Sequence, residues 1–260
     1  MGRYAAATVM AVGMLFSAPV GAQSVVATGQ SFITPRLLPG MHTPDGGRMS
    51  GLRLSLEPGW KTYWRSPGET GVPPRFDWSA STNVKDVIIH WPRPGLFESF
   101  GMRTAGYQDV VLFPLEVHPV DPERPVVLNL SAELGVCKDI CVLEQVETSL
   151  QIEPDEREIG ARQIQSALAR VPAMAEQSSA SLNACRFSGE GGKHSLTATL
   201  NLGQGLSNPV VLVEHTGGAW IRKTEQKSVA EGLELHVNFS LPEGQNWIDR
   251  SAFRMTLLAD

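Results

Sequence analysis

The sequence predicts a mainly β protein, in which an antiparallel β-sandwich is followed by a linker helix and a second, smaller β-sandwich domain. Three observations indicate this fold class. Apolar and polar residues alternate with period two along several short runs. The chain has 25 glycines and 18 prolines among 260 residues, which is typical of a turn-rich β protein. One segment between the two sets of alternating runs has helical spacing instead.

The first domain is expected over residues 23–154. Its alternating runs are Leu52–Leu56, Val87–Trp91, Val126–Leu134 and Val146–Ile152. Each run is bounded by Gly, Pro, Asp or Asn, which is the pattern of half-buried strands in an antiparallel sandwich. The aromatic-rich segment that begins at Trp60 and ends at Trp78 is interpreted as core, with a loop that crosses the sheet edge.

A helix is expected from Asp155 to Val171. Ile164 and Leu168 lie one helical turn apart, and acidic residues fill the expected first turn, where negative charge suits the helix dipole. Pro172 ends the pattern.

Residues 155–180 therefore form the helix and a small polar linker, and residues 181–260 form the second β domain. Its alternating runs are Leu196–Leu202 and Leu233–Leu241, accompanied by the apolar segments 209–215 and 252–259.

Residues 1–22 are predicted to be a cleaved secretory signal peptide. Arg3 supplies the positive start, an apolar run from Ala5 to Phe16 is too short to span a bilayer, and Val20 and Ala22 occupy the small-residue positions of a cleavage site. The alternative is an N-terminal membrane anchor. Cleavage after Ala22 predicts a soluble, exported protein.

The charge distribution argues against nucleic-acid binding. The net charge is -5, and lysines and arginines are scattered rather than grouped into a basic run.

Cys137 and Cys141 follow directly on an expected strand, with Gly135 permitting a change of direction before them. The pair is therefore expected at a strand end or in a hairpin loop. If the three residues between them make one helical turn, both sulfurs face the same side and can bond. A structural disulfide is one reading, but a loop of about five residues contributes roughly 2 kcal/mol, against about 4 kcal/mol for a Cys137–Cys185 bond. The spacing therefore favours a redox pair over a structural disulfide.

A metal site is the third reading of the pair. Zinc usually needs four ligands, and the six histidines are dispersed, so no zinc site is predicted and the histidines are interpreted as solvated or strand-face residues. Two thiolates would suffice for copper(I), with Met102 as an assisting ligand. Cys185 is the odd thiol, and it is expected to be buried near the entry of a strand.

Four segments of the first domain carry a resemblance to a known family. They are "GWKTYWRSPGETGVPPRFDW", "WPRP", "GYQDVVLFPLEV" and "GVCKDIC". Together they resemble the N-terminal periplasmic domain of the DsbD family of thiol-disulfide interchange proteins, in particular the branch called ScsB, which is tied to copper tolerance. The resemblance is strong over residues 51–152.

The resemblance implies an immunoglobulin-like sandwich that acts as a protein-disulfide reductase without a cofactor. It implies that Cys141 attacks a partner disulfide, that Cys137 resolves the mixed disulfide, and that an aromatic cap loop with Phe97 and Phe100 shields the pair. The implied partners are a membrane electron donor and periplasmic thiol-disulfide proteins of thioredoxin-like or isomerase-like type.

Several alternatives stay open. Lys138 is expected to lower a thiol pKa, whereas Asp139 would oppose this or accept a proton, and both are equally well read as solvated turn residues. Full-length family members continue into a membrane domain and a thioredoxin-like domain that this sequence does not contain, so another protein is expected to supply electrons. A copper-binding module that uses the same thiols and a β scaffold with an inert disulfide are the competing functions.

Overall fold

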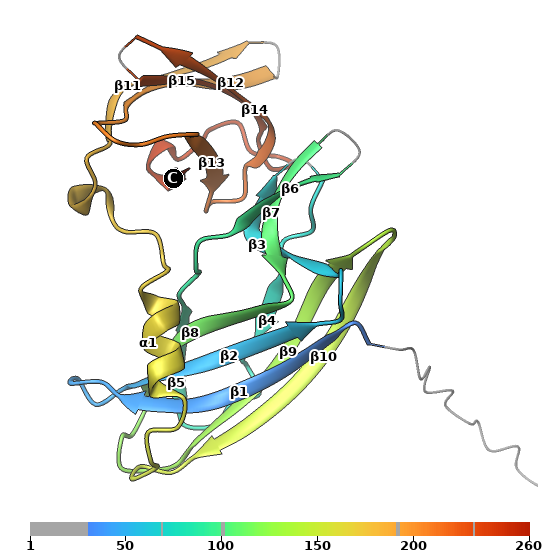
Figure 1. Cartoon of the computed structure of the whole chain (residues 1–260), viewed down its shortest axis with the longest axis vertical. Helices are drawn as coiled ribbons and strands as arrows, with labels where there is room; N and C mark the ends of the chain where they lie inside the picture. The colour runs from blue at the N-terminus through green and yellow to red at the C-terminus, as the bar shows by residue number, and fades with distance from the viewer. Residues whose placement is uncertain (1–30, 69, 100–101, 191–192, 231) are drawn as a thin grey trace, which may run out of the picture. The chain divides into compact units, whose positions relative to one another are not determined.

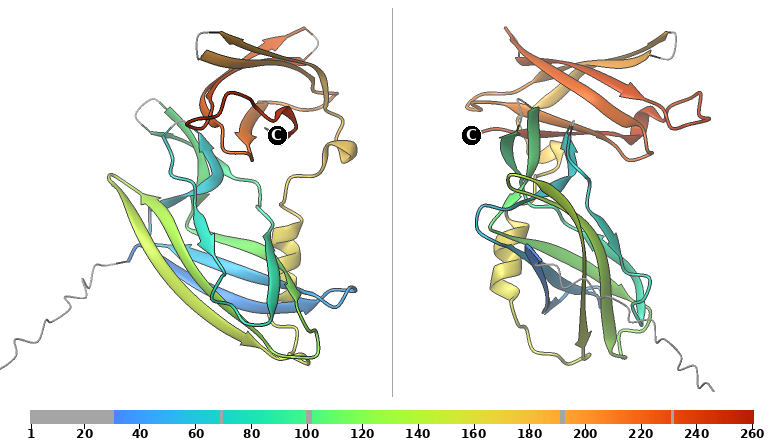
Figure 2. Two further views of the ribbon diagram at one scale, coloured as in Figure 1. Left: turned by 180° about the vertical axis from the view of Figure 1, so that it is seen from behind. Right: turned by 90° about the vertical axis from the view of Figure 1, so that its right-hand side faces the viewer.

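The computed structural model describes residues 31–68, 70–99, 102–190, 193–230 and 232–260. Two antiparallel sheets make up the first β region, residues 33–152. One sheet has the order β1 (Ile33–His42), β2 (Arg48–Leu56), β8 (Val110–Pro119), β5 (Val84–Ile89). The other has the order β10 (Cys141–Ile152), β9 (Val126–Cys137), β3 (Lys61–Gly68), β7 (Met102–Gln108), β6 (Gly95–Ser99), and the short β4 (Arg75–Asp77) pairs with β9. Figure 1 shows these strands, and the views of Figure 2 show the two sheets as separate layers.

The core of this region lies between the two sheets, as the alternation predicts. Leu52 and Leu54 of β2 face Leu128 and Leu130 of β9, and all four side chains are buried in one hydrophobic cluster. Trp64 of β3 is fully buried in the same cluster. The expectation that the aromatic segment contributes to the core is therefore confirmed for Trp64, and the predicted antiparallel sandwich is confirmed for the region.

The second β region, residues 181–258, has a hydrophobic cluster of its own. One sheet has the order β11 (Ser181–Glu190), β12 (Lys193–Asn201), β15 (Gly232–Ser240), β14 (Trp220–Val229), and β13 (Val210–His215) pairs with β16 (Phe253–Leu258). Buried side chains from both sheets, such as Leu235 and Val213, form the cluster. Residues Ser31–Asp260 group as one compact unit, and the division into two domains at residue 181 stays a prediction.

The expected helix Asp155–Val171 is too long. The observed α1 spans Ala161–Leu168, with no acidic residue in its first turn, so the predicted interaction of Asp155 with the helix dipole is wrong. Gly160 precedes the helix in the left-handed conformation, with φ 84°, which sets the point where the helix begins. Ile164 then packs over Gly51 of β2, where a side chain would collide with it.

The segment before α1 is held out of the helix by a contact that is distant in sequence. The buried Arg48 guanidinium donates hydrogen bonds to the backbone carbonyls of Glu153 and Glu156, at 3.2 and 3.4 Å. Burial lowers the pKa of Arg48, and the nearby Glu156 and Glu158 carboxylates offset part of that effect. Because Arg48 donates to these carbonyl oxygens, they do not need the backbone N–H partners that a helix would supply.

No helix among the described residues has the length and apolar character needed to cross a membrane. The predicted signal peptide, residues 1–22, lies outside the described residues, so its cleavage stays a prediction.

Candidate functional site

The two cysteines lie opposite each other at the turn end of a β-hairpin and form a disulfide bond. Cys137 is the last residue of β9, Cys141 is the first residue of β10, and they are cross-strand partners with their Cα atoms 4.1 Å apart. The backbone N–H of Lys138 donates to the carbonyl of Ile140 at 3.0 Å and closes the turn. The expected position of the pair, at a strand end or in a hairpin loop, is therefore confirmed, and cross-strand pairing rather than a helical turn brings the sulfurs together.

Gly135 provides space for an aromatic ring rather than a change of direction. It lies inside β9, paired with Leu143 of β10, and the strand continues past it to Cys137. A Cβ atom at this position would lie 3.0 Å from two ring carbons of Tyr63 and 3.1 Å from Cβ of Val72. The absence of a side chain at Gly135 therefore lets the Tyr63 ring lie flat over the strand.

Tyr63 brings its hydroxyl group to the disulfide. Its oxygen lies 2.9 Å from Sγ of Cys137 and 3.7 Å from Sγ of Cys141. Burial raises the pKa of Tyr63, so the hydroxyl stays protonated at neutral pH and is able to donate a hydrogen bond to a thiolate. We did not expect this role from the sequence, in which Tyr63 is grouped with the core aromatic residues.

The two sulfur-bearing residues differ in exposure. Cys137 is only 7% exposed, whereas Cys141 is exposed to solvent. Two large apolar side chains next to the disulfide are also exposed, Ile140 at 63% and Leu143 at 55%. Cys141 is therefore the sulfur that solvent can reach, and it lies beside exposed apolar side chains of the kind that mark interaction surfaces.

Lys138 and Asp139 form the exposed tip of the hairpin. Nζ of Lys138 donates to the backbone carbonyl of Pro58 at 3.3 Å, and its side chain lies against Gly59. The ammonium group therefore has a neutral partner, and the proposed effects of Lys138 and Asp139 on the thiols stay predictions.

The proposed cap loop is largely part of a hairpin. Phe97 lies on β6, half-buried, with Nζ of Lys61 5.1 Å from its ring centroid. Phe100 lies outside the described residues. Since β6 and β7 are joined to β9 through β3, Phe97 and the disulfide belong to one sheet, and the shielding role of both phenylalanines stays a prediction.

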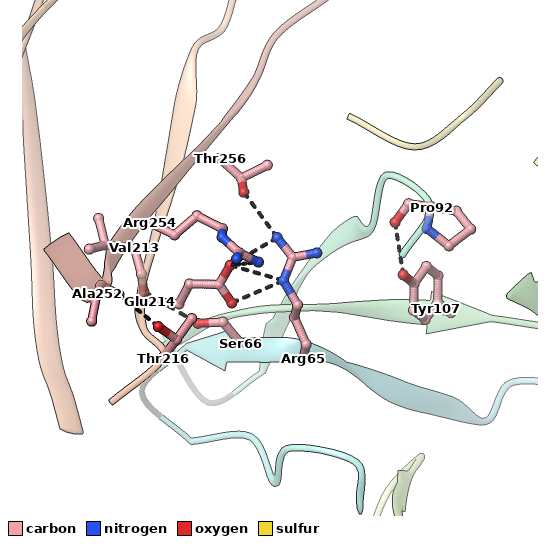
Figure 3. A network of polar contacts seen from close by, with 10 residues as sticks. All are labelled: Arg65, Ser66, Pro92, Tyr107, Val213, Glu214, Thr216, Ala252, Arg254 and Thr256. Atoms are coloured by element: carbon pink, nitrogen blue, oxygen red, sulfur yellow. Dashed lines mark hydrogen bonds and ion pairs between the residues drawn. The ribbon is translucent and has the colours of Figure 1, made fainter. Parts of the chain in front are cut away.

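Arg65 anchors the strand that carries Tyr63. Its guanidinium makes hydrogen bonds of 2.9 and 3.0 Å to both carboxylate oxygens of Glu214 on β13, and a further bond of 3.4 Å to Thr256 of β16 (Figure 3). The paired carboxylate is only 13% exposed, so solvent screens this ion pair less than a surface pair. The second β region thus holds β3 two residues beyond Tyr63.

Cys185 does not fit its expected environment. It lies on β11, an edge strand of its sheet, and its thiol is free and exposed. The prediction of a buried thiol is wrong because β11 lies at the edge of its sheet and little of the protein packs against its side chains. Apart from Phe187, the described side chains of this strand are exposed. Partial burial still raises the pKa of the Cys185 thiol, which disfavours the reactive thiolate.

We expect Tyr63→Phe to slow the reaction of the reduced protein with a small disulfide by roughly tenfold at neutral pH. The lost hydrogen bond to a charged sulfur is worth about 1.5 kcal/mol or more, and about 1.4 kcal/mol corresponds to tenfold. The pH at which the rate is half-maximal should rise. Trp220→Phe, which changes an exposed aromatic residue of the second β region, is the control and should react at the rate of the unmodified protein. Equal rates for Tyr63→Phe and the unmodified protein would rule out this role.

Two comparisons with known proteins found matches to this chain. Residues 32–153 match the family model described as the N-terminal part of the thiol:disulfide interchange protein DsbD. The crystal structure of the N-terminal periplasmic domain of ScsB from Proteus mirabilis is 25% identical, with a TM-score of 0.60, and the match covers 88% of this chain and 94% of that one. It therefore extends beyond residues 32–153 into the second β region.

A weaker structural match is the DsbD N-terminal domain of Neisseria meningitidis in the reduced form. It is 14% identical with a TM-score of 0.30, and it covers 47% of this chain and 85% of that one. A search of curated proteins by sequence found no match.

Proposed function

Because residues 32–153 belong to the family of DsbD N-terminal domains, whose fold is an immunoglobulin-like β-sandwich, we propose that this chain relays electrons by thiol-disulfide exchange at Cys137 and Cys141. The relay runs between a membrane reductant and oxidised periplasmic proteins. The observation that carries the proposal is the hairpin disulfide, in which one sulfur is exposed and the other is buried beside the Tyr63 hydroxyl.

The proposed exchange starts from the reduced pair. The Cys141 thiolate attacks one sulfur of a partner disulfide, the partner S–S bond breaks, and its other sulfur leaves as a thiolate. A mixed disulfide now joins Cys141 to the partner. The Cys137 thiolate attacks Sγ of Cys141, the second partner sulfur leaves, and the Cys137–Cys141 bond forms. The partner gains two electrons, its thiolates take up protons from solvent, and this chain loses the same two electrons.

The difference in exposure supports this assignment of roles. Cys141 is accessible to a partner, whereas Cys137 lies behind it, 7% exposed, and needs to reach only Cys141. A hydroxyl donor within reach of both sulfurs stabilises whichever one carries negative charge during the exchange. The reverse sequence, with a reduced dithiol as the attacking partner, regenerates the reduced pair.

An exchange assay with the purified protein tests the proposal. The protein is reduced with dithiothreitol, freed of reductant and mixed with a disulfide-bonded peptide, and free thiols are counted by alkylation and mass spectrometry. We expect one peptide disulfide to be reduced for each Cys137–Cys141 pair that is oxidised. A Cys137→Ser, Cys141→Ser protein is the control, and exchange by this variant at the rate of the intact pair would contradict the proposal.

Localisation is part of the same proposal. Membership of a family of periplasmic domains supports an exported protein, and cell fractionation tests it. Reduced, alkylatable Cys141 in the periplasmic fraction of growing cells would support a membrane electron donor, whereas recovery of the protein with cytoplasmic markers would exclude the proposed route.

A further inference from the structure

A second group of ionisable side chains gathers away from the cysteine hairpin, on the other sheet of the first β region. Glu116 and His118 lie on β8, and Asp45 lies in the turn between β1 and β2. We propose that Asp45, Glu116 and His118 form a binding site for a divalent metal ion of the zinc class. The prediction that the histidines are only solvated or strand-face residues rested on their dispersal along the sequence, and Asp45 is about seventy residues away from Glu116 and His118.

The distances between donor atoms fit a tetrahedral ion. Nε2 of His118 lies 3.1 Å from Oε1 of Glu116 and 3.8 Å from Oδ2 of Asp45, and the three donor atoms lie within 4.8 Å of one another. Zinc bonds of about 2.1 Å to nitrogen and oxygen place neighbouring tetrahedral ligands about 3.4 Å apart. Small side-chain movements bring all three atoms to such an ion, and the fourth position is left for water.

A neighbouring carboxylate orients the imidazole ring. Nδ1 of His118 lies 2.8 Å from Oδ1 of Asp86 on β5, so its N–H donates to that carboxylate and Nε2 faces Glu116 and Asp45. Metal-binding histidines commonly carry this kind of carboxylate partner on the second ring nitrogen. Nε2 of His90 lies 3.0 Å from the other oxygen of Glu116 and positions that ligand in the same way.

The turn that carries Asp45 reaches His118 because of Gly47. A Cβ atom at Gly47 would lie 3.0 Å from the backbone oxygen of Val117 and 3.4 Å from Cδ2 of His118. A larger residue would push the β1–β2 turn away from β8 and separate Asp45 from the imidazole. The local backbone therefore supports the convergence of the three ligands.

The charges of the cluster favour a cation. Three carboxylates, from Asp45, Asp86 and Glu116, surround His118, and His90 is the other titratable group in contact with them.

Calorimetric titration with Zn²⁺ tests this site. The protein is tag-free, oxidised at Cys137–Cys141 and carries Cys185→Ser, so that no free thiol competes. We expect saturable binding of one Zn²⁺ per chain with micromolar or tighter affinity. Absence of saturable one-to-one binding would overturn the proposal.

Variants locate the ion. His118→Ala and Asp45→Ala should each lower the affinity at least tenfold, and Asp86→Asn, which changes only the partner of the imidazole, by roughly tenfold. His236→Ala removes an exposed histidine of the second β region and should bind Zn²⁺ like the parent protein. Circular dichroism checks that each variant is folded. Unchanged affinity in folded His118→Ala, or an equal loss in His236→Ala, would show that the ion binds elsewhere and would refute the site.

Discussion

Cys137→Ser protein is expected to accumulate mixed disulfides with its periplasmic partners through Cys141. The exposed Cys141 thiolate still attacks a partner disulfide, but the residue that would release the partner has no sulfur. The intermediate therefore persists, and catalytic turnover falls to the background rate. Acid quenching, alkylation and non-reducing electrophoresis reveal the trapped species, and mass spectrometry identifies the linked cysteines.

The matched control for this experiment is Cys141→Ser. It leaves only Cys137, which is 7% exposed, and it should trap little or nothing. Both variants need a Cys185→Ser background because Cys185 is free and exposed and would form adducts of its own. Adducts that form equally with both single-cysteine proteins, or with neither, would contradict the roles assigned to the two cysteines.

Trp64→Ala should lower the free energy of unfolding by about 3–5 kcal/mol. The side chain is fully buried between the two sheets of the first β region, and truncation both removes apolar burial and leaves a cavity. Urea unfolding followed by circular dichroism measures the change. Trp64 also sits beside Tyr63 on β3, so the loosened strand should weaken the hold of the Tyr63 hydroxyl on the disulfide.

Trp247→Ala is the control for this loss of stability. Its side chain is 64% exposed, so its removal should change the free energy of unfolding by less than about 0.5 kcal/mol. Equal destabilisation by the two substitutions would show that Trp64 does not have the packing role that its burial indicates.

The strands were predictable because burial on one face leaves a period of two in the sequence. The runs around Leu54, Leu130 and Leu235 all lie on observed strands with their apolar side chains inward. The end of the strand before the cysteines was mispredicted, because the alternation was followed only to Leu134 and β9 continues to Cys137. Val136 is also fully buried, so the same period continues through the strand to Cys137.

The position of Tyr63 also follows from the alternation. Thr62 and Trp64 are buried, so Lys61, Tyr63 and Arg65 must face the other side of β3. That face carries the contacts to Phe97, the disulfide and Glu214. A strict count of period two would therefore have separated Tyr63 from the core aromatic residues.

Other features depend on contacts between distant segments and could not be read from local patterns. The short helix results from Arg48, which binds carbonyls more than a hundred residues away. The exposure of Cys185 depends on the position of β11 at the edge of its sheet. The alternation of apolar and polar residues does not reveal the order of the strands in a sheet. The His118 cluster likewise joins a turn and two strands that are far apart in sequence.

The reduction potential of the Cys137–Cys141 pair tests the central claim most directly. The Cys185→Ser protein is equilibrated in glutathione and dithiothreitol buffers, and the oxidised fraction is measured by alkylation. An exchange module should have a potential above about -300 mV, within the range of about -120 to -270 mV found for thiol-disulfide exchange proteins. A potential below about -300 mV, as in structural disulfides of secreted proteins, would contradict the proposed function.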